Sequence, residues 1–120
     1  MKVLLTGATG FIGNYVVDEL LKYDLDVIAS GLKAQRNIHT QWLDNITYIQ
    51  ADLNESRKDW FSYLGEPDML IHLSWQGLPN YKEQFHISRN LPNNYSFLKL
   101  SELINSSFKD YVKLFKLYYN

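Results

Sequence analysis

The sequence contains no cysteine, which excludes a disulfide framework and any metal site built from thiolates. Neither sign of charge dominates: 12 basic and 13 acidic side chains give a formal net charge of -1, so bulk positive charge does not recruit nucleic acid. No apolar run approaches the roughly 18 residues of a membrane span, and Thr6-Gly7 ends the apolar start before a signal-peptide core forms. We therefore expect a cytoplasmic globular protein with no nucleic-acid or membrane partner.

The amino acids that are present suit one compact domain. The chain has 120 residues, of which 46% are hydrophobic and 15% aromatic, an ordinary composition for a folded protein. This length is enough for one hydrophobic core but not for two. We expect residues 1–120 to form a single domain.

Strand-like and helix-like patterns alternate along the chain. Apolar and β-branched runs predict strands over residues 3–5, 27–30, 46–51 and 69–73. A short helix within residues 38–43 is plausible, and residues 108–120 fit either a helix or a fifth strand. Strands that alternate with helices at this spacing predict right-handed crossovers and a parallel sheet.

Three helices are expected between and after these strands. The first places Ile12, Val16 and Leu20 on one face, and the second begins at an Asn54 N-cap. The third extends from about residue 90 to 105. Its predicted inner stripe consists of Asn90, Asn93, Phe97, Leu100 and Ile104.

Three glycines, Gly7, Gly10 and Gly13, lie between the first predicted strand and the first helix. The first permits a tight turn, the second a close approach of a pyrophosphate to the backbone, and the third close packing of helix on strand. The N–H groups at a helix N-terminus also favour phosphate. The arrangement predicts dinucleotide binding, with a tight turn that binds nothing as the alternative. Because no Gly-Lys-Ser/Thr follows, a Walker-type loop is excluded.

The segment Thr6-Gly7-Ala8-Thr9-Gly10-Phe11-Ile12-Gly13 resembles the opening of the NAD-dependent epimerase/dehydratase family, the extended branch of the short-chain dehydrogenases/reductases. Three more segments are similar to family motifs: Ala51-Asp52-Leu53, Ile71-His72-Leu73-Ser74-Trp75 and Asn90-x-x-Asn93-Asn94-x-x-Phe97-Leu98. The resemblance covers residues 1 to about 108. It implies an α/β, Rossmann-like parallel sheet with helices on both faces and strand order 3-2-1-4, with a fifth strand beside the fourth in a complete domain.

The resemblance also implies a set of cofactor-binding residues. In the family, the acidic turn after the third strand touches the adenine, the end of the fourth strand lines the cofactor cleft, and the leading Asn of the helix motif approaches the cofactor. The residues implied here are Gly7, Thr9, Gly10, Phe11, Ile12, Gly13, Ser30, Arg36, Asp52, Leu53, Leu73, Ser74, Trp75 and Asn90.

The end of the second predicted strand bears on the choice between NAD and NADP. An acidic residue usually accepts hydrogen bonds from the ribose of NAD at this point, but the sequence has Ser30, followed by Lys33 and Arg36. A small polar residue with nearby cations suits a 2′-phosphate, which favours NADP slightly over NAD. The alternative is that both cations are simply solvated loop charges.

Several other residues have structural interpretations. Asp52 is either the adenine contact or a turn residue that caps the next segment. His72 is expected to be a core histidine with a satisfied ring, and the tryptophans Trp42, Trp60 and Trp75 are expected to pack, with Trp75 bordering the nucleotide. His39 and His86 form no ligand cluster. Asn90, as a polar group on an apolar stripe, needs a partner from the backbone or the cofactor.

The chemistry of the family uses a Tyr-x-x-x-Lys pair with a Ser or Thr. The only such spacing in this sequence is Tyr95 and Lys99, which are expected to point away from the cleft and to lie too early in the chain. We therefore predict no catalytic residue. The catalytic Ser or Thr should follow a fifth strand, close to or beyond residue 120.

These observations favour the NAD(P)-binding N-terminal part of a nucleotide-sugar epimerase, dehydratase or reductase that is not catalytic by itself and looks truncated. The nucleotide sugar would then be a partner only if the missing half is present. The alternative is a non-catalytic module that senses NAD(P) or binds a partner chain, and a third option is a degenerate chain without a ligand. An unpaired edge at the fourth strand would allow self-association.

Overall fold

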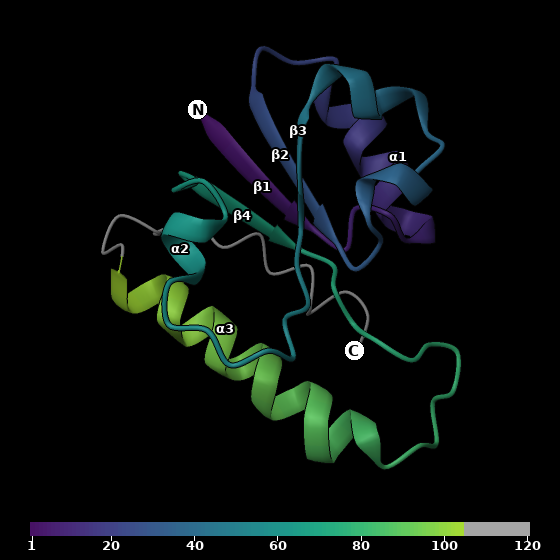
Figure 1. Ribbon diagram of the computed structural model, residues 1–120, viewed down its shortest axis with the longest axis vertical. Helices are drawn as coiled ribbons and strands as arrows, with labels where there is room; N and C mark the ends of the chain where they lie inside the picture. Colours follow the sequence, from purple (N-terminus) through teal and green to yellow (C-terminus); the bar gives the residue numbers. More distant parts are fainter. Residues whose placement is uncertain (105–120) are drawn as a thin grey trace.

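The fold is a parallel sheet with helices on both faces (Figure 1). The computed structural model describes residues 1–104. The strands are β1 (Lys2–Thr6), β2 (Asp26–Gly31), β3 (Thr47–Gln50) and β4 (Met69–His72), and the α-helices are α1 (Phe11–Leu20), α2 (Trp60–Tyr63) and α3 (Leu91–Ile104). Two 3-10 turns, η1 (Gln35–Asn37) and η2 (Gln41–Asn45), and a π-helical turn, η3 (His86–Asn90), complete the elements.

The strand order is β3-β2-β1-β4 and every pairing is parallel, which confirms the predicted order 3-2-1-4. In the register, Leu5 of β1 lies between Ala29 of β2 and Ile71 of β4. The possible helix or strand over residues 108–120 lies outside the described residues. So do the side chains of Leu100 and Ile104, which the predicted stripe of α3 included.

Two cores cover the two faces of the sheet, because alternate residues of a strand point to opposite sides. Leu5, Ala29 and Ile71 pack with Val17 of α1 and with Trp42 of η2. On the opposite face, the adjacent strand residues pack with α2 and α3; this second cluster contains Leu4, Ile28, Leu70, Trp60, Leu64 and Phe97. Both faces are therefore buried, as a parallel sheet requires.

The first helix differs from the prediction in its inner face. Gly13 and Val17 are its buried residues, whereas Ile12 is 37% exposed and Val16 and Leu20 are only partly buried. The prediction that Ile12 lies on the inner face was wrong. The reason is that close packing of the glycine turn places Gly13, the residue without a side chain, nearest to the strand.

Asn54 is not the N-cap of the second helix. That helix begins only after Asp59 and has four residues, and Asn54 instead belongs to a turn in which its backbone N–H donates to Asp52 Oδ1 at 2.9 Å. The short helix considered plausible within residues 38–43 is found as the 3-10 helix η2, shifted to Gln41–Asn45. The third helix was expected to begin near residue 90, but helical structure already begins at His86, in η3.

Candidate functional site

The glycine turn joins β1 to α1 at the carboxyl end of the sheet. Gly7 has φ +71°, and a Cβ there would lie 2.7 Å from the carbonyl carbon of Leu73. A Cβ on Gly13 would lie 2.1 Å from the Gly7 oxygen. The fold itself therefore demands glycine at both positions, the first for backbone conformation and both for close approach.

Gly10 is different because its surroundings are open. A Cβ there would meet only the Gly7 oxygen, at 3.3 Å, and the residue is exposed. Gly10 is the N-cap of α1, yet no side chain caps this helix and no acidic residue occupies its first turn. The first N–H groups of an α-helix have no partner within the helix, so this end can hold an anion.

The residues beside this turn have distinct positions. Phe11 and Ile12 are exposed, 82% and 37% respectively. Thr9 packs under the end of β2, where a Cβ on Gly31 would lie 2.8 Å from its Oγ1. The turn is fixed to β2 by the Ala8 N–H, which donates to the Ser30 carbonyl at 3.0 Å.

Ser30 and Arg36, both predicted to bind the cofactor, differ in exposure. The Ser30 side chain is only 2% exposed, whereas Lys33 and Arg36 are exposed. The Lys33 carbonyl accepts a hydrogen bond from the Tyr48 hydroxyl at 2.6 Å, and burial raises the pKa of Tyr48 to about 12. The cations after β2 therefore extend from a loop whose backbone is tied to β3.

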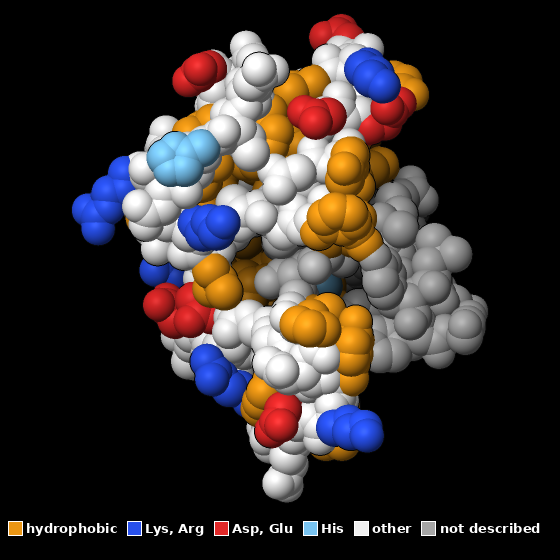
Figure 2. All heavy atoms as spheres, turned by 90° about the vertical axis from the view of Figure 1, so that its right-hand side faces the viewer, with side chains coloured by type: hydrophobic (Ala, Val, Ile, Leu, Met, Phe, Trp, Pro, Cys, Tyr) orange, Lys and Arg blue, Asp and Glu red, His pale blue; other side chains and the backbone are white. Residues whose placement is uncertain are grey.

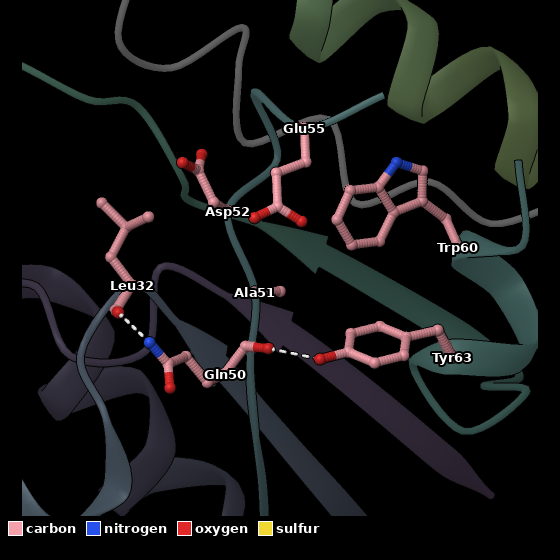
Figure 3. A pocket seen from close by; sticks show the side chains of 7 residues that line it. All are labelled: Leu32, Gln50, Ala51, Asp52, Glu55, Trp60 and Tyr63. Atoms are coloured by element: carbon pink, nitrogen blue, oxygen red, sulfur yellow. Dashed lines mark hydrogen bonds between the residues drawn. The ribbon is translucent and has the colours of Figure 1, made fainter. Parts of the chain in front are cut away.

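A pocket of about 240 Å³ opens beside the end of β3 (Figure 3). Two hydrogen bonds link residues that line it: Gln50 Nε2 donates to the Leu32 carbonyl at 3.0 Å, and the Tyr63 hydroxyl donates to the Gln50 carbonyl at 2.7 Å. Its lining residues are Leu32, Gln50, Ala51, Asp52, Glu55, Trp60 and Tyr63. Of these, Asp52 was a predicted site residue, Ala51 belongs to the same family-like motif, and Trp60 was expected to pack. No motif in the sequence pointed to the other four as site residues.

Asp52 stands at the junction of two loops. Its Oδ1 accepts from the Asn54 N–H at 2.9 Å and from Gln76 Nε2 at 2.8 Å, whereas Oδ2 has no hydrogen bond among the described residues. Leu53, the next residue, is 5% exposed and its side chain lies in the core. The turn interpretation and a contact to adenine are compatible, because each uses a different oxygen.

The loop after β4 packs on the glycine turn through the backbone of Leu73 and Ser74. Trp75 Nε1 donates to His86 Nδ1 at 2.9 Å, and the two rings are stacked. Asn90 is 1% exposed, and its Nδ2 donates to the Gln76 carbonyl at 2.7 Å. The backbone thus supplies the partner that Asn90 needs.

His72 is a core residue with both ring nitrogens bonded, as predicted. Asn94 Nδ2 donates to the Asn90 carbonyl, so Asn94 Oδ1 accepts from His72 Nε2–H at 2.7 Å. The other nitrogen, Nδ1, then accepts from the Thr6 hydroxyl at 2.7 Å. Burial lowers the pKa of His72 to about 4, partly opposed by the bond to Asn94. The ring is neutral at physiological pH and serves the fold.

The Tyr95 and Lys99 pair lies on the outer side of α3, as predicted. Tyr95 is 63% exposed, and Lys99 is exposed with its Nζ 6.0 Å from the centre of the tyrosine ring. Phe97, which faces the sheet, is 1% exposed. This pair therefore lies on the side of α3 that faces away from the sheet.

Other kinds of site find little support in residues 1–104. This part of the chain has no group of three His, Asp or Glu side chains that could hold a metal ion, and none of its helices is long and apolar enough to span a membrane. Figure 2 shows acidic and basic side chains interspersed on one face, with hydrophobic groups between them.

Comparison with known proteins identifies a family and several relatives. The model of the NAD dependent epimerase/dehydratase family matches residues 3–91. A curated relative, dTDP-6-deoxy-L-talose 4-dehydrogenase (NAD(+)) of Aggregatibacter actinomycetemcomitans, is 31% identical over 99 residues, which are 82% of this chain and 36% of the relative.

Two solved structures show the same fold. UDP-glucose 4-epimerase of Thermus thermophilus, in complex with NAD, has a TM-score of 0.62 at 21% identity, covering 86% of this chain and 34% of that one. UDP-glucose-4-epimerase of Stenotrophomonas maltophila, with bound NAD and formylated UDP-arabinopyranose, has a TM-score of 0.66 at 18% identity. This match covers 85% of this chain and 33% of that one. The chain spans about a third of the length of these relatives. Since the family match covers most of its residues, the chain belongs to the NAD-dependent epimerase/dehydratase family.

Proposed function

We propose that this chain binds NAD or NADP, with the pyrophosphate over the turn from Gly7 to Gly13. The observation that carries the proposal is the open, uncapped N-terminus of α1 at Gly10. Unpaired N–H groups and the helix dipole attract the phosphates there, and the absent Cβ permits close approach. Thr9, Phe11 and Ile12 would flank the pyrophosphate.

The adenosine half would lie toward the ends of β2 and β3. Asp52 borders the pocket there and keeps Oδ2 available to accept from the adenine amino group. The other half would pass along Leu73, Ser74 and Trp75 after β4, near Asn90. The buried side chains of Ser30 and Leu53 restrict these two residues to backbone contacts or support of the loops.

A slight preference for NADP follows from the loop after β2. No acidic residue occurs from Ser30 to Arg36, and the exposed Lys33 and Arg36 can pair with a 2′-phosphate. We expect Arg36→Ala to weaken the affinity for NADP about tenfold and to change the affinity for NAD little. Arg89→Ala, which removes another exposed arginine, is the matched control and should change neither affinity. Equal affinities of the parent for both dinucleotides would remove the preference.

In a longer protein, this chain would be the cofactor-binding part of an enzyme acting on nucleotide sugars. This proposal is supported by the family and by the relatives that are named as dTDP-sugar and UDP-sugar enzymes. By itself, the chain is expected to be inactive, because a positioned acid–base group contributes a factor of about 100 to 10,000 in rate and Tyr95 points away from the site.

Calorimetric titration with NAD and NADP tests the proposed binding. Gly10→Val should abolish it, because the valine methyls occupy the space that the phosphates need. The variant should still fold, with a moderately lower melting temperature, because its Cβ would meet only the Gly7 oxygen, at 3.3 Å, and because valine is a poorer N-cap than glycine. Unchanged cofactor affinity in this variant would rule out the assignment of the pyrophosphate to this turn.

The proposed inactivity is tested by mixing the chain with NAD(P)H or NAD(P) and a panel of nucleotide sugars. We expect no turnover above the reaction without protein. Turnover that disappears in Tyr95→Phe would show instead that this tyrosine is catalytic.

A further inference from the structure

Gln76, in the loop after β4, is a residue that no family motif in the sequence pointed to. Its Nε2 reaches across to the loop after β3 and donates to Asp52 Oδ1 at 2.8 Å. The Asn54 N–H donates to the same oxygen at 2.9 Å. Two donors therefore fix one oxygen of the carboxylate, and they come from different loops.

Gln76 and Asn54, which carry these two donors, are themselves held by the end of η3 and the start of α3. Asn90, which is 1% exposed, donates to the Gln76 carbonyl at 2.7 Å. Asn93 Nδ2 donates to Asn54 Oδ1 at 2.9 Å. Gln76, through its carbonyl, and Asn54, through its side chain, are thus tied to consecutive helical segments, and these bonds restrict the rotation of Asp52.

We propose that Gln76 is a positioning residue for base recognition: it holds Asp52 Oδ1 so that Oδ2 accepts from the exocyclic amino group of adenine. This inference rests on the proposed binding of a dinucleotide. An oxygen held in place by charge-assisted hydrogen bonds loses less freedom when the ligand binds, so the bond to adenine is stronger. Because both donors bond to Oδ1, the lone pairs of Oδ2 remain available to accept a hydrogen bond from the base.

The chemistry predicts discrimination between purines. Nicotinamide hypoxanthine dinucleotide has a carbonyl oxygen where NAD has the amino group, and that oxygen would face the Asp52 carboxylate. A site arranged to accept a hydrogen bond rejects an analogue that cannot donate one. We expect the parent to bind NAD about tenfold more tightly than this analogue, the ratio expected for one hydrogen bond to a charged group.

The test compares Gln76→Leu with the parent, by calorimetry with both dinucleotides. Leucine fills similar space but cannot donate. We expect the affinity for NAD to fall and the affinity for the hypoxanthine analogue to stay nearly constant, so that the tenfold ratio shrinks to about threefold or less. Gln84→Leu, at an exposed glutamine of the same connection, should leave the ratio unchanged.

The outcomes separate this inference from the proposed function. A parent that binds neither dinucleotide would overturn both. A parent that binds NAD and the analogue equally, or a Gln76→Leu variant that keeps the parental ratio, would overturn the role of Gln76 while dinucleotide binding stands. An equal loss of both affinities in Gln76→Leu would show that Gln76 only supports the loop.

Discussion

At the scale of single residues, the surroundings of His72 favour the neutral form of its ring. The ring is 8% exposed and bridges β1 to α3 through Thr6 and Asn94. Its Nδ1 accepts the threonine proton, so a second ring proton would break this arrangement and would be poorly solvated. Burial accordingly lowers the pKa of His72 from 6.5 to about 4.

This shift predicts that stability falls as the pH is lowered. Between pH 6.5 and 4 the unfolded chain binds a proton at this residue that the folded chain does not. The stabilisation is therefore complete above about pH 6.5 and is lost as the pH falls toward 4, a loss on the order of 3 kcal/mol. Urea denaturation at pH 7, 6 and 5 measures the first part of this loss, about 2 kcal/mol.

Two histidine variants isolate the source of this pH dependence. His72→Gln removes the titrating ring and should flatten the dependence between pH 7 and 5. His39→Gln, at an exposed histidine, should leave it as in the parent. A parent with constant unfolding free energy from pH 7 to 5 would show that His72 titrates normally.

At the scale of elements, α3 joins the core and the candidate site. Phe97 contacts Trp60 edge-to-face, with ring centres 5.7 Å apart, and lies 5.4 Å from the His72 ring. Since α2 has only four residues, it depends on this contact for its position. The start of the same helix, with the turn before it, carries Asn90 and Asn93, which anchor the loops at the site.

Truncation of the Phe97 side chain should therefore strongly destabilise the fold. We expect Phe97→Ala to lower the unfolding free energy by about 3 to 5 kcal/mol, because it leaves a cavity under α3. Tyr95→Ala, two residues away on the exposed side, should change it by about 0.5 kcal/mol. Urea denaturation of both variants gives the comparison, and similar losses at the two positions would contradict the packing described.

At the scale of the whole molecule, β3 and β4 are the edge strands of the sheet within the described residues. Within residues 1–104, β4 pairs with β1 alone, and its Leu70 and Ile71 are buried. A strand edge without a partner offers backbone N–H and C=O groups to another chain. We propose that the chain self-associates through this edge.

Light scattering over a range of concentrations should show dimers or larger species. Met69→Lys places a charge on the edge strand and should shift the population toward monomer. Tyr95→Lys adds the same charge on the outer side of α3 and should have no such effect. A monodisperse monomer at high concentration would argue against association through this edge.

Local patterns in the sequence were sufficient to predict much of the fold. The strands, the glycine turn and the outward Tyr95 follow from short-range periodicity and from the backbone freedom of glycine, which neighbours in the chain determine. The strand order was instead implied by the resemblance to the family, and the structure confirms it. The satisfied His72 was also predictable, since a polar ring in an apolar strand must find partners.

Only the tertiary structure decided which residues meet at the site. Ile12 became exposed because the packing of Gly13 set the rotation of α1, and Asn54 became a loop anchor because Asn93 reached it from α3. The bond between Gln76 and Asp52 joins residues 24 positions apart. No periodicity records such a contact, because it depends on where two strands end in space rather than on either local sequence.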